Sequence, residues 1–211
     1  DGRGSDDGRG SDDGRGSDVD SLKTGSNNST SFEPQHEGPL PAPSGPCAYL
    51  ISFSCYGTWL HGDTRGSVDK QHNLYGTPVI RPNPARETSA RRRLNQVPYQ
   101  MDEPRRALVL AAFREVCDWR GWWLFAAHVR KAHVHVVVQA SDPPERVLND
   151  IKAHASRCLN RAGFDGPGCK RWSRHGSTRY IWTRKGIEKA VGYVLSEQGN
   201  PMAVYVGPGL C

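Results

Sequence analysis

The chain has 211 residues, of which 36% are hydrophobic and 24% are charged, with 28 Lys and Arg against 22 Asp and Glu. This composition fits one ordinary globular domain with a tail and excludes a collagen-like or coiled-coil chain. No apolar run approaches the roughly 18 residues that a membrane-spanning helix needs, and the N-terminus lacks a secretory signal pattern. We therefore expect a cytoplasmic protein that does not enter a membrane.

Charge divides the chain at Pro46. Residues 1–46 carry nine acids and four bases, a net charge of −5, so the remaining 165 residues carry +11. A polyanionic partner such as nucleic acid is the commonest reason for so much like charge, and solubility alone is the alternative. The six cysteines include no CxxC pair, so zinc-ribbon and zinc-finger spacings are excluded and reduced thiols are expected.

Residues 1–46 are predicted to be a disordered, acidic, low-complexity tail. The sequence DGRGSD repeats three times over residues 1–18, and the rest of the tail is rich in Ser, Gly, Pro and Asn. Our preferred explanation is a fragment, or a reading frame that begins too far upstream. An acidic tail that competes for the basic surface is the alternative. Residues 47–211 would then form the functional domain.

The folded part begins with a pattern of strands and one helix. Alternating aromatic and β-branched residues predict a first strand over 48–60, which a long, basic, patternless loop follows over 61–101. Apolar residues at helical spacing predict a helix over 103–120. Two apolar, β-prone runs at 122–129 and 133–140 are separated by three residues, which predicts a hairpin.

The C-terminal part adds two helices and one strand. Residues 141–144 (SDPP) are expected to cap a second helix that Gly163 ends, with Lys152 lying off its apolar stripe. A short strand over 177–183 and a last helix that Gly199 terminates complete the pattern. The order β-α-β-β-α-β-α predicts an α+β fold of the ferredoxin-like, split βαβ type, an antiparallel sheet with helices on one face and an added C-terminal helix.

Two histidines interrupt the apolar strand HVHVVV. His133 and His135 are two residues apart, so their imidazoles point to the same face of the strand and could share one metal ion. Two histidines buried for structure alone would each need a hydrogen-bond partner. Spacing alone makes metal binding and a structural role about equally favoured.

The predicted C-terminal helix carries a second candidate pair. At about 100° per residue, Tyr193 falls outside the apolar face of this helix, and Glu197 lies one turn later, almost above Tyr193. An ordinary surface tyrosine is favoured about two to one from helix position alone. Together with His133 and His135, however, an oxygen ligand could hold a metal that polarises a phosphodiester while the Tyr193 phenolate attacks phosphorus.

This ordered combination resembles the single-tyrosine HUH transposases of the IS200-like class, which include the REP-associated tyrosine transposases. The resemblance rests on HVHVVV and on the tyrosine some 58 positions later in AVGYVLSEQG, and it covers about residues 48–202. The stretches YGTWLHGDTRGSVD, KAHASRCLN and WSRHGSTRYIW look like segments of one branch of that family. One departure is Lys131-Ala132, where the REP-associated group often has Pro-Asn.

The resemblance implies a dimeric, metal-dependent enzyme, associated with the nucleoid, that cuts and rejoins single-stranded DNA at hairpin-bearing element ends. His133 and His135 would be metal ligands, and Tyr193 would form a 5′-phosphotyrosine link that leaves a free 3′-OH. The family's third ligand is commonly a Gln or Asn four residues after the tyrosine. Glu197 holds that position here and Gln198 follows it, so both are candidates.

Ligand chemistry narrows the expected metal to Mn²⁺ or Mg²⁺. Imidazole pairs suit softer ions than Mg²⁺, whereas phosphoryl chemistry and an added carboxylate favour Mg²⁺ or Mn²⁺. Two alternatives to an active transposase stay open. One is a domesticated or inactive transposase that only binds nucleic acid, and the other is a different HUH nuclease such as a replication initiator or relaxase.

Basic residues interleaved with aromatic residues predict a surface for single-stranded DNA. Trp182, in the middle of a predicted strand, is expected in the core rather than on this surface. The DNA-binding candidates are Arg91, Arg92, Arg93, Lys152, Arg157, Arg174, His175 and Arg179.

Overall fold

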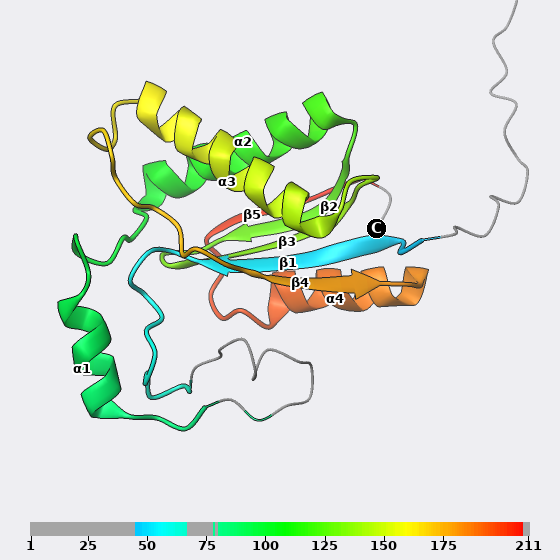
Figure 1. Cartoon of the computed structure of the whole chain (residues 1–211). Helices are drawn as coiled ribbons and strands as arrows, with labels where there is room; N and C mark the ends of the chain where they lie inside the picture. Colours follow the sequence, from blue (N-terminus) through cyan, green and yellow to red (C-terminus); the bar gives the residue numbers. More distant parts are fainter. Residues whose placement is uncertain (1–44, 67–77, 79, 209–211) are drawn as a thin grey trace, which may run out of the picture. The chain divides into compact units, whose positions relative to one another are not determined.

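Figure 1 shows the computed structural model of the chain, which describes residues 45–66, 78 and 80–208. All but the last two residues of the predicted tail, 1–46, lie outside the described residues. The described part contains a five-stranded sheet in which every pair of neighbouring strands is antiparallel. In spatial order the strands are β4 (Ser177–Ile181), β1 (Ala48–Ser54), β3 (His133–Gln139), β2 (Trp123–Val129) and β5 (Ala203–Val206).

Helices cover both faces of this sheet. The helices α2 (Glu103–Arg120) and α3 (Pro144–Arg161) lie together on one face, and α4 (Arg184–Ser196) lies on the other (Figure 1). A further helix, α1 (Pro84–Arg92), lies beside one end of the sheet. The order of the first four strands confirms the predicted α+β fold, because each α-helical crossover skips one strand of the sheet.

Two elements were not predicted. The structure places α1 inside the segment 61–101 that the sequence presented as a patternless loop, and β5 follows the last helix as an edge strand beside β2. The helix α1 buries none of its residues, so it has no apolar stripe for periodicity to detect. Of the same loop, residues 67–77 and 79 lie outside the described residues.

Alternation along β3 divides its side chains between two cores. Val134, Val136 and Val138 pack with α2 and α3, whereas Val137 packs on the α4 side. His133 and His135 therefore lie on the same side of β3 as Val137, the side that α4 covers. The register with β1 and β2 places three polar side chains around this row, with Ser54 opposite His133 and with Ser52 and His128 on either side of His135.

Several predicted boundaries were wrong for local reasons. The first strand ends at Ser54 rather than at residue 60, because the chain turns at Gly57, whose φ is +72°. The side chains of the SDPP segment do not cap α3. Instead Asp142 accepts a hydrogen bond from the Trp122 indole at 3.1 Å, while Pro143 holds the cap position. The last helix ends at Ser196, three residues before Gly199.

Two side chains differ in exposure from the prediction. Lys152 was expected off the apolar stripe of α3, but it is 7% exposed and belongs to the buried side of the helix. Trp182 was expected in the core, but it is 64% exposed where β4 has just ended. All five cysteines in the described part are free thiols, as expected.

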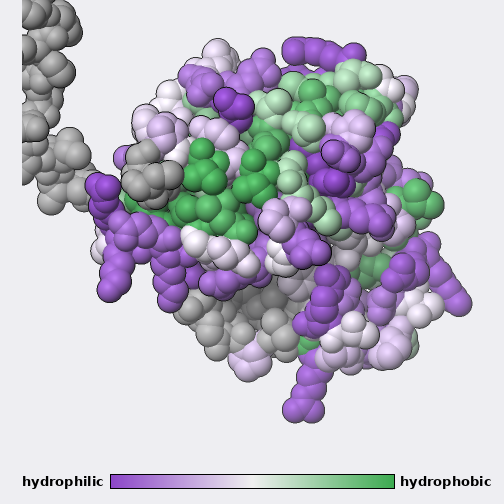
Figure 2. Space-filling model, turned by 180° about the vertical axis from the view of Figure 1, so that it is seen from behind, coloured by the Kyte–Doolittle hydropathy of each residue, from purple (hydrophilic) through white to green (hydrophobic). Residues whose placement is uncertain are grey.

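The side of the molecule opposite β4 carries an apolar patch bordered by hydrophilic side chains (Figure 2). Exposed apolar residues occur at the end of α2, in β2 and in β5, and they include Trp119, Trp123 and Val206. No helix in the described ranges is long and apolar enough to cross a bilayer.

Candidate functional site

The structure brings Tyr193 to the two histidines of β3. The rings of Tyr193 and His135 meet edge to face, with centroids 5.8 Å apart and an interplanar angle of 89°. The tyrosine is half-buried because α4 packs its apolar side on the sheet through residues such as Val191 and Val194. Its ring therefore contacts the histidine row and is not that of an ordinary surface tyrosine.

A serine of the neighbouring strand orients His135. Ser52 Oγ lies 2.8 Å from Nδ1 of His135, and the two residues are direct partners across β1 and β3. Metal-binding histidines commonly have one ring nitrogen engaged in such a contact, which fixes the tautomer and the ring orientation. With Nδ1 engaged, Nε2 is the nitrogen of His135 that is available to a metal ion.

The environment keeps both histidines neutral. Burial lowers the pKa of His135 to about 4, and the nearby His133, His128 and Arg130 add to this effect. Burial also lowers the pKa of His133, with smaller contributions from the positive charges of Arg65 and Arg130. Because only a neutral imidazole has a lone pair to donate, this electrostatic setting suits metal ligands.

The end of α4 holds both candidates for the third ligand. Glu197 is exposed and occupies the C-cap of the helix, with φ at −98°. Gln198 is partly buried, and its side-chain amide donates a hydrogen bond to the Tyr193 carbonyl at 3.4 Å. Either side chain would add an oxygen donor to two imidazoles, a donor set that fits Mn²⁺ or Mg²⁺ engaged in phosphoryl chemistry. The choice between them stays a prediction.

A buried histidine that the sequence did not single out fixes α4 against the sheet. His128 is fully buried in β2, and its Nδ1 lies 3.0 Å from the Val194 carbonyl, which accepts the ring proton. Its Nε2 accepts a hydrogen bond from the Met202 amide at 3.2 Å. Both ring nitrogens thus hold the segment that carries Tyr193. The signal was present, since His128 is the lone polar residue of the strand WLFAAHV.

Arg130 is a second residue that the sequence did not single out. It follows β2 directly, and its Nη1 is buried without a hydrogen-bond partner among the described residues. Its Nη2 would lie 3.5 Å from a Cβ placed on Gly199, in the turn after α4. A guanidinium held between the histidines and this turn offers donors to an anionic ligand.

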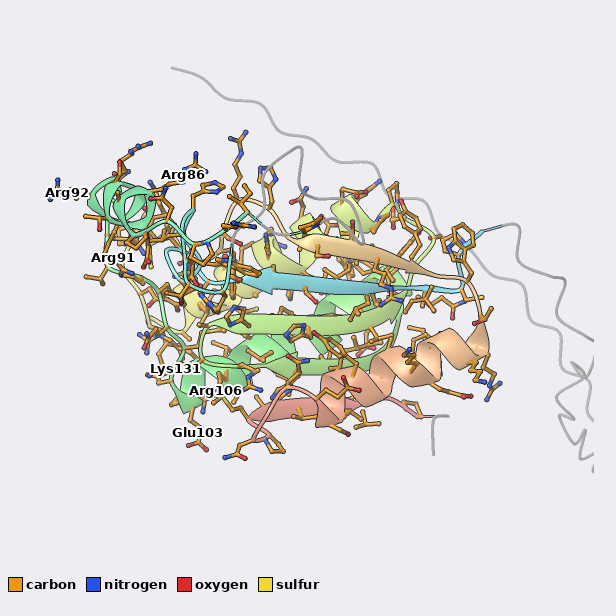
Figure 3. The ribbon with its side chains drawn as sticks, turned by 90° about the horizontal axis from the view of Figure 1, so that it is seen from below. Arg86, Arg91, Arg92, Glu103, Arg106 and Lys131 are labelled. Carbon is orange, nitrogen blue, oxygen red and sulfur yellow. The ribbon has the colours of Figure 1, made fainter. Side chains whose placement is uncertain are left out.

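Three of the predicted DNA-binding residues lie on α1. Arg91 and Arg92 belong to the last turn of the helix, and Arg93 is its C-cap. The loop after β1 holds the start of α1, because the Asn83 amide donates to the Gly62 carbonyl at 2.9 Å. Figure 3 shows Arg86, Arg91 and Arg92 projecting from α1, with Arg106 and Lys131 at the same end of the sheet.

The other predicted DNA-binding residues are distributed over α3, β4 and the segment between them. Arg157, Arg174, His175 and Arg179 are exposed. Lys152 is an internal residue instead, whose ammonium donates to the carbonyls of Ser173 and His175 at 3.0 and 3.2 Å. Burial lowers the pKa of Lys152 to about 8. Its charge therefore supports the loop before β4 rather than a bound nucleic acid.

No family model and no curated protein matches the chain. Among solved structures, the chain is similar to one described as the structure of a REP-associated tyrosine transposase bound to a REP hairpin. The identity is 12% and the TM-score is 0.39, over 77% of this chain and 72% of the other. A similarity of this extent does not assign a function.

Proposed function

We propose that this protein is a metal-dependent single-tyrosine transposase, which cleaves and rejoins single-stranded DNA through a 5′-phosphotyrosine intermediate. The observation that carries the proposal is the edge-to-face contact of Tyr193 with His135, in a row with His133 on one face of β3. Both histidines come from β3 and Tyr193 comes from α4, and the HVHVVV and AVGYVLSEQG motifs support the same function.

In this mechanism the chain's own residues hold the reactants. His133, His135 and an oxygen of Glu197 or Gln198 would hold Mg²⁺ or Mn²⁺, which supplies Lewis-acid polarisation of the scissile phosphate. The Tyr193 oxygen loses its proton to solvent and forms a bond to phosphorus, while the bond from phosphorus to the 3′ oxygen breaks and that oxygen takes up a proton from solvent and leaves as a 3′-OH. The reverse attack, by a 3′-OH on the phosphotyrosine, rejoins DNA and releases Tyr193.

Basic residues around the site support a nucleic-acid substrate. Arg130 is partly exposed and its charge lowers the pKa of both histidines, so its guanidinium would pair with a phosphate next to the scissile one. The arginines of α1 lie at the end of the sheet where β1 ends and β3 begins, which is also the end that carries His133 (Figure 3). The sequence resemblance adds two further parts to the proposal: the protein acts on hairpin-bearing DNA ends, and it does so as a homodimer.

The test is a covalent capture experiment with the full chain. A labelled pool of single-stranded oligonucleotides, each with a hairpin and randomised flanks, is incubated with the protein in Mn²⁺ or in EDTA. We expect an SDS-resistant protein–DNA adduct that requires the metal, disappears in Tyr193→Phe and persists in Tyr205→Phe, a matched control on β5. An adduct that persists in Tyr193→Phe would overturn the assignment of the nucleophile.

A second candidate function is binding of nucleic acid without cleavage. The exposed position of Glu197, where the resembled family commonly has Gln or Asn, favours this alternative. It predicts salt-sensitive binding of the same oligonucleotide pool with no adduct under any metal. That result would replace the transposase proposal by a domesticated DNA-binding role.

A further inference from the structure

We propose that Glu115, His154 and Cys158 form a zinc site on the face of the sheet opposite Tyr193. Glu115 lies on α2, and the other two residues lie on α3, the helix that packs against α2 (Figure 1). Among the described residues, these three offer donor atoms that all lie within 4.8 Å of one another. The site is independent of the function proposed above.

Two of the three donor–donor distances are close to those of a tetrahedral zinc site. His154 Nε2 lies 3.0 Å from Glu115 Oε2, and Cys158 Sγ lies 3.8 Å from the same oxygen. Typical zinc bond lengths place two ligands of a tetrahedron about 3.4 Å apart for nitrogen and oxygen, and about 3.6 Å apart for sulfur and oxygen. Shifts of a few tenths of an ångström would bring these two pairs to zinc-binding distances, and the third pair, His154 Nε2 and Cys158 Sγ, lies within 4.8 Å.

The helix arrangement presents these donors together. His154 and Cys158 are four residues apart and so lie on the same side of α3, facing α2. The His154 side chain is 12% exposed and Cys158 is 8% exposed, whereas the Glu115 side chain is 61% exposed. One side of the cluster is thus open to water, which would supply the fourth ligand. A thiolate and an imidazole select Zn²⁺ over Mg²⁺.

Zinc binding would change the protonation of two residues. In the structure His154 Nε2 donates to the Glu115 carboxylate, and Arg157 Nη2 lies 3.4 Å from Nδ1 of the same ring. On binding, the Cys158 thiol loses its proton to solvent and the imidazole proton moves from Nε2 to Nδ1. Arg157 can then no longer donate to Nδ1 and must turn away. Arg157→Gln should therefore tighten zinc binding.

Cobalt(II) gives a direct readout of this site. We expect the full, reduced chain to bind Co²⁺ with a thiolate-to-cobalt charge-transfer band that added Zn²⁺ abolishes. The band should be lost in Cys158→Ser, weakened at least tenfold in affinity in His154→Ala, and kept in the control Cys169→Ser. It should also be kept in His133→Ala/His135→Ala, because those residues provide no sulfur and lie on the other face of the sheet.

Two results would overturn the proposal. One is a band that survives in Cys158→Ser, and the other is the absence of any band at millimolar Co²⁺ in the wild-type chain. If Cys158→Ser does not fold, the exposed variant Glu115→Gln replaces it, and an unchanged cobalt affinity in that variant would equally contradict the site. In a His133→Ala/His135→Ala background, which lacks the histidines of the other proposed metal site, zinc should also raise the melting temperature by linking α2 to α3, and Glu115→Gln should abolish this rise.

Discussion

Ser52 Oγ lies 2.8 Å from Nδ1 of His135, so a side chain of β1 determines which nitrogen of the proposed metal ligand is free. The contact is fixed by the strand register, because Ser52 and His135 are direct partners. The same histidine also meets the Tyr193 ring, with centroids 5.8 Å apart. Ser52 is therefore a positioning residue in the proposed mechanism.

Replacing Ser52 should impair catalysis more than folding. Ser52→Ala removes one hydrogen bond, worth about 1 kcal/mol of stability, and frees the His135 ring to rotate. Removal of such an orienting hydrogen bond typically lowers metal affinity or activity by about 10–100-fold. The measurement is the rate of metal-dependent adduct formation alongside DNA binding in EDTA, which should not change.

Ser177→Ala is the matched control for this variant. Ser177 is the partner of Ser52 on β4 and is exposed. It should leave the adduct rate at the wild-type value. Wild-type adduct formation by Ser52→Ala would show that the hydrogen bond to His135 plays no part in the reaction.

The sequence predicted the histidine row because two-residue alternation in a strand needs no tertiary information. The contact between Tyr193 and His135 has a different origin, since it depends on the face of the sheet on which α4 packs. The apolar stripe of α4 predicted that the helix would pack on something, but not against which side. The hydrogen bond of His128 to the Val194 carbonyl then fixes the position of α4 along the sheet.

Other features left no readable pattern. The helix α1 has the Asn83-Pro84 start signal, but its charged residues have no apolar face. Lys152 looked like a surface residue because a lysine in a helix is nearly always exposed, whereas here two loop carbonyls and the Phe53 ring surround its ammonium. Such burial depends on a loop that arrives 21 residues later and cannot be read from helix periodicity.

Acid should destabilise the metal-free protein through its buried histidines. Burial lowers the pKa of His128, His133 and His135, the last to about 4, whereas unfolded histidines titrate near pH 6.5. The unfolded chain therefore binds more protons below pH 6.5, and stability that is complete above this value is lost as the pH falls toward 4. His135 alone contributes about 3 kcal/mol to this loss.

Denaturant unfolding in EDTA at pH 7 and pH 4.5 measures this effect. The free energy of unfolding should fall less in His135→Gln than in the wild type over the same interval, because glutamine does not titrate. Equal losses in the two proteins would mean that His135 titrates in the folded state as it does in the unfolded chain.

The arginines of α1 and the buried Lys152 should respond to different experiments. Replacing Arg91, Arg92 and Arg93 by Ala should weaken binding of single-stranded DNA. It should also reduce the slope of log K against log salt concentration by up to about two, because each phosphate that an arginine no longer neutralises accounts for about 0.7. Their stability cost should be small, since the pair of Arg91 with Glu87 is exposed.

Lys152→Met should have the opposite profile. The Ser173 carbonyl loses its side-chain donor, whereas the His175 carbonyl keeps the hydrogen bond from Ser173 Oγ, and together these changes should cost about 1–3 kcal/mol of stability. The salt slope of DNA binding should not change, because the ammonium does not reach the surface. Anisotropy titrations at several salt concentrations distinguish the two variants, and a reduced slope in Lys152→Met would place this lysine on the DNA after all.

Trp182 should contribute to binding of single strands through stacking. Its ring lies on that of Tyr180, with centroids 6.0 Å apart and planes 16° from parallel, and the two residues are 64% and 46% exposed. An exposed aromatic pair on an edge strand offers a face on which an unpaired base can stack. Trp182→Ala should therefore lower the affinity for single-stranded DNA by about 1–3 kcal/mol, or roughly 5–150-fold.

Two control variants accompany this measurement. Trp182→Phe should keep most of the affinity, and Trp119→Ala, which removes an exposed indole from α2, should leave the affinity unchanged. Because paired bases cannot stack on the ring, an equal loss for duplex DNA would point to a general disturbance of β4 instead.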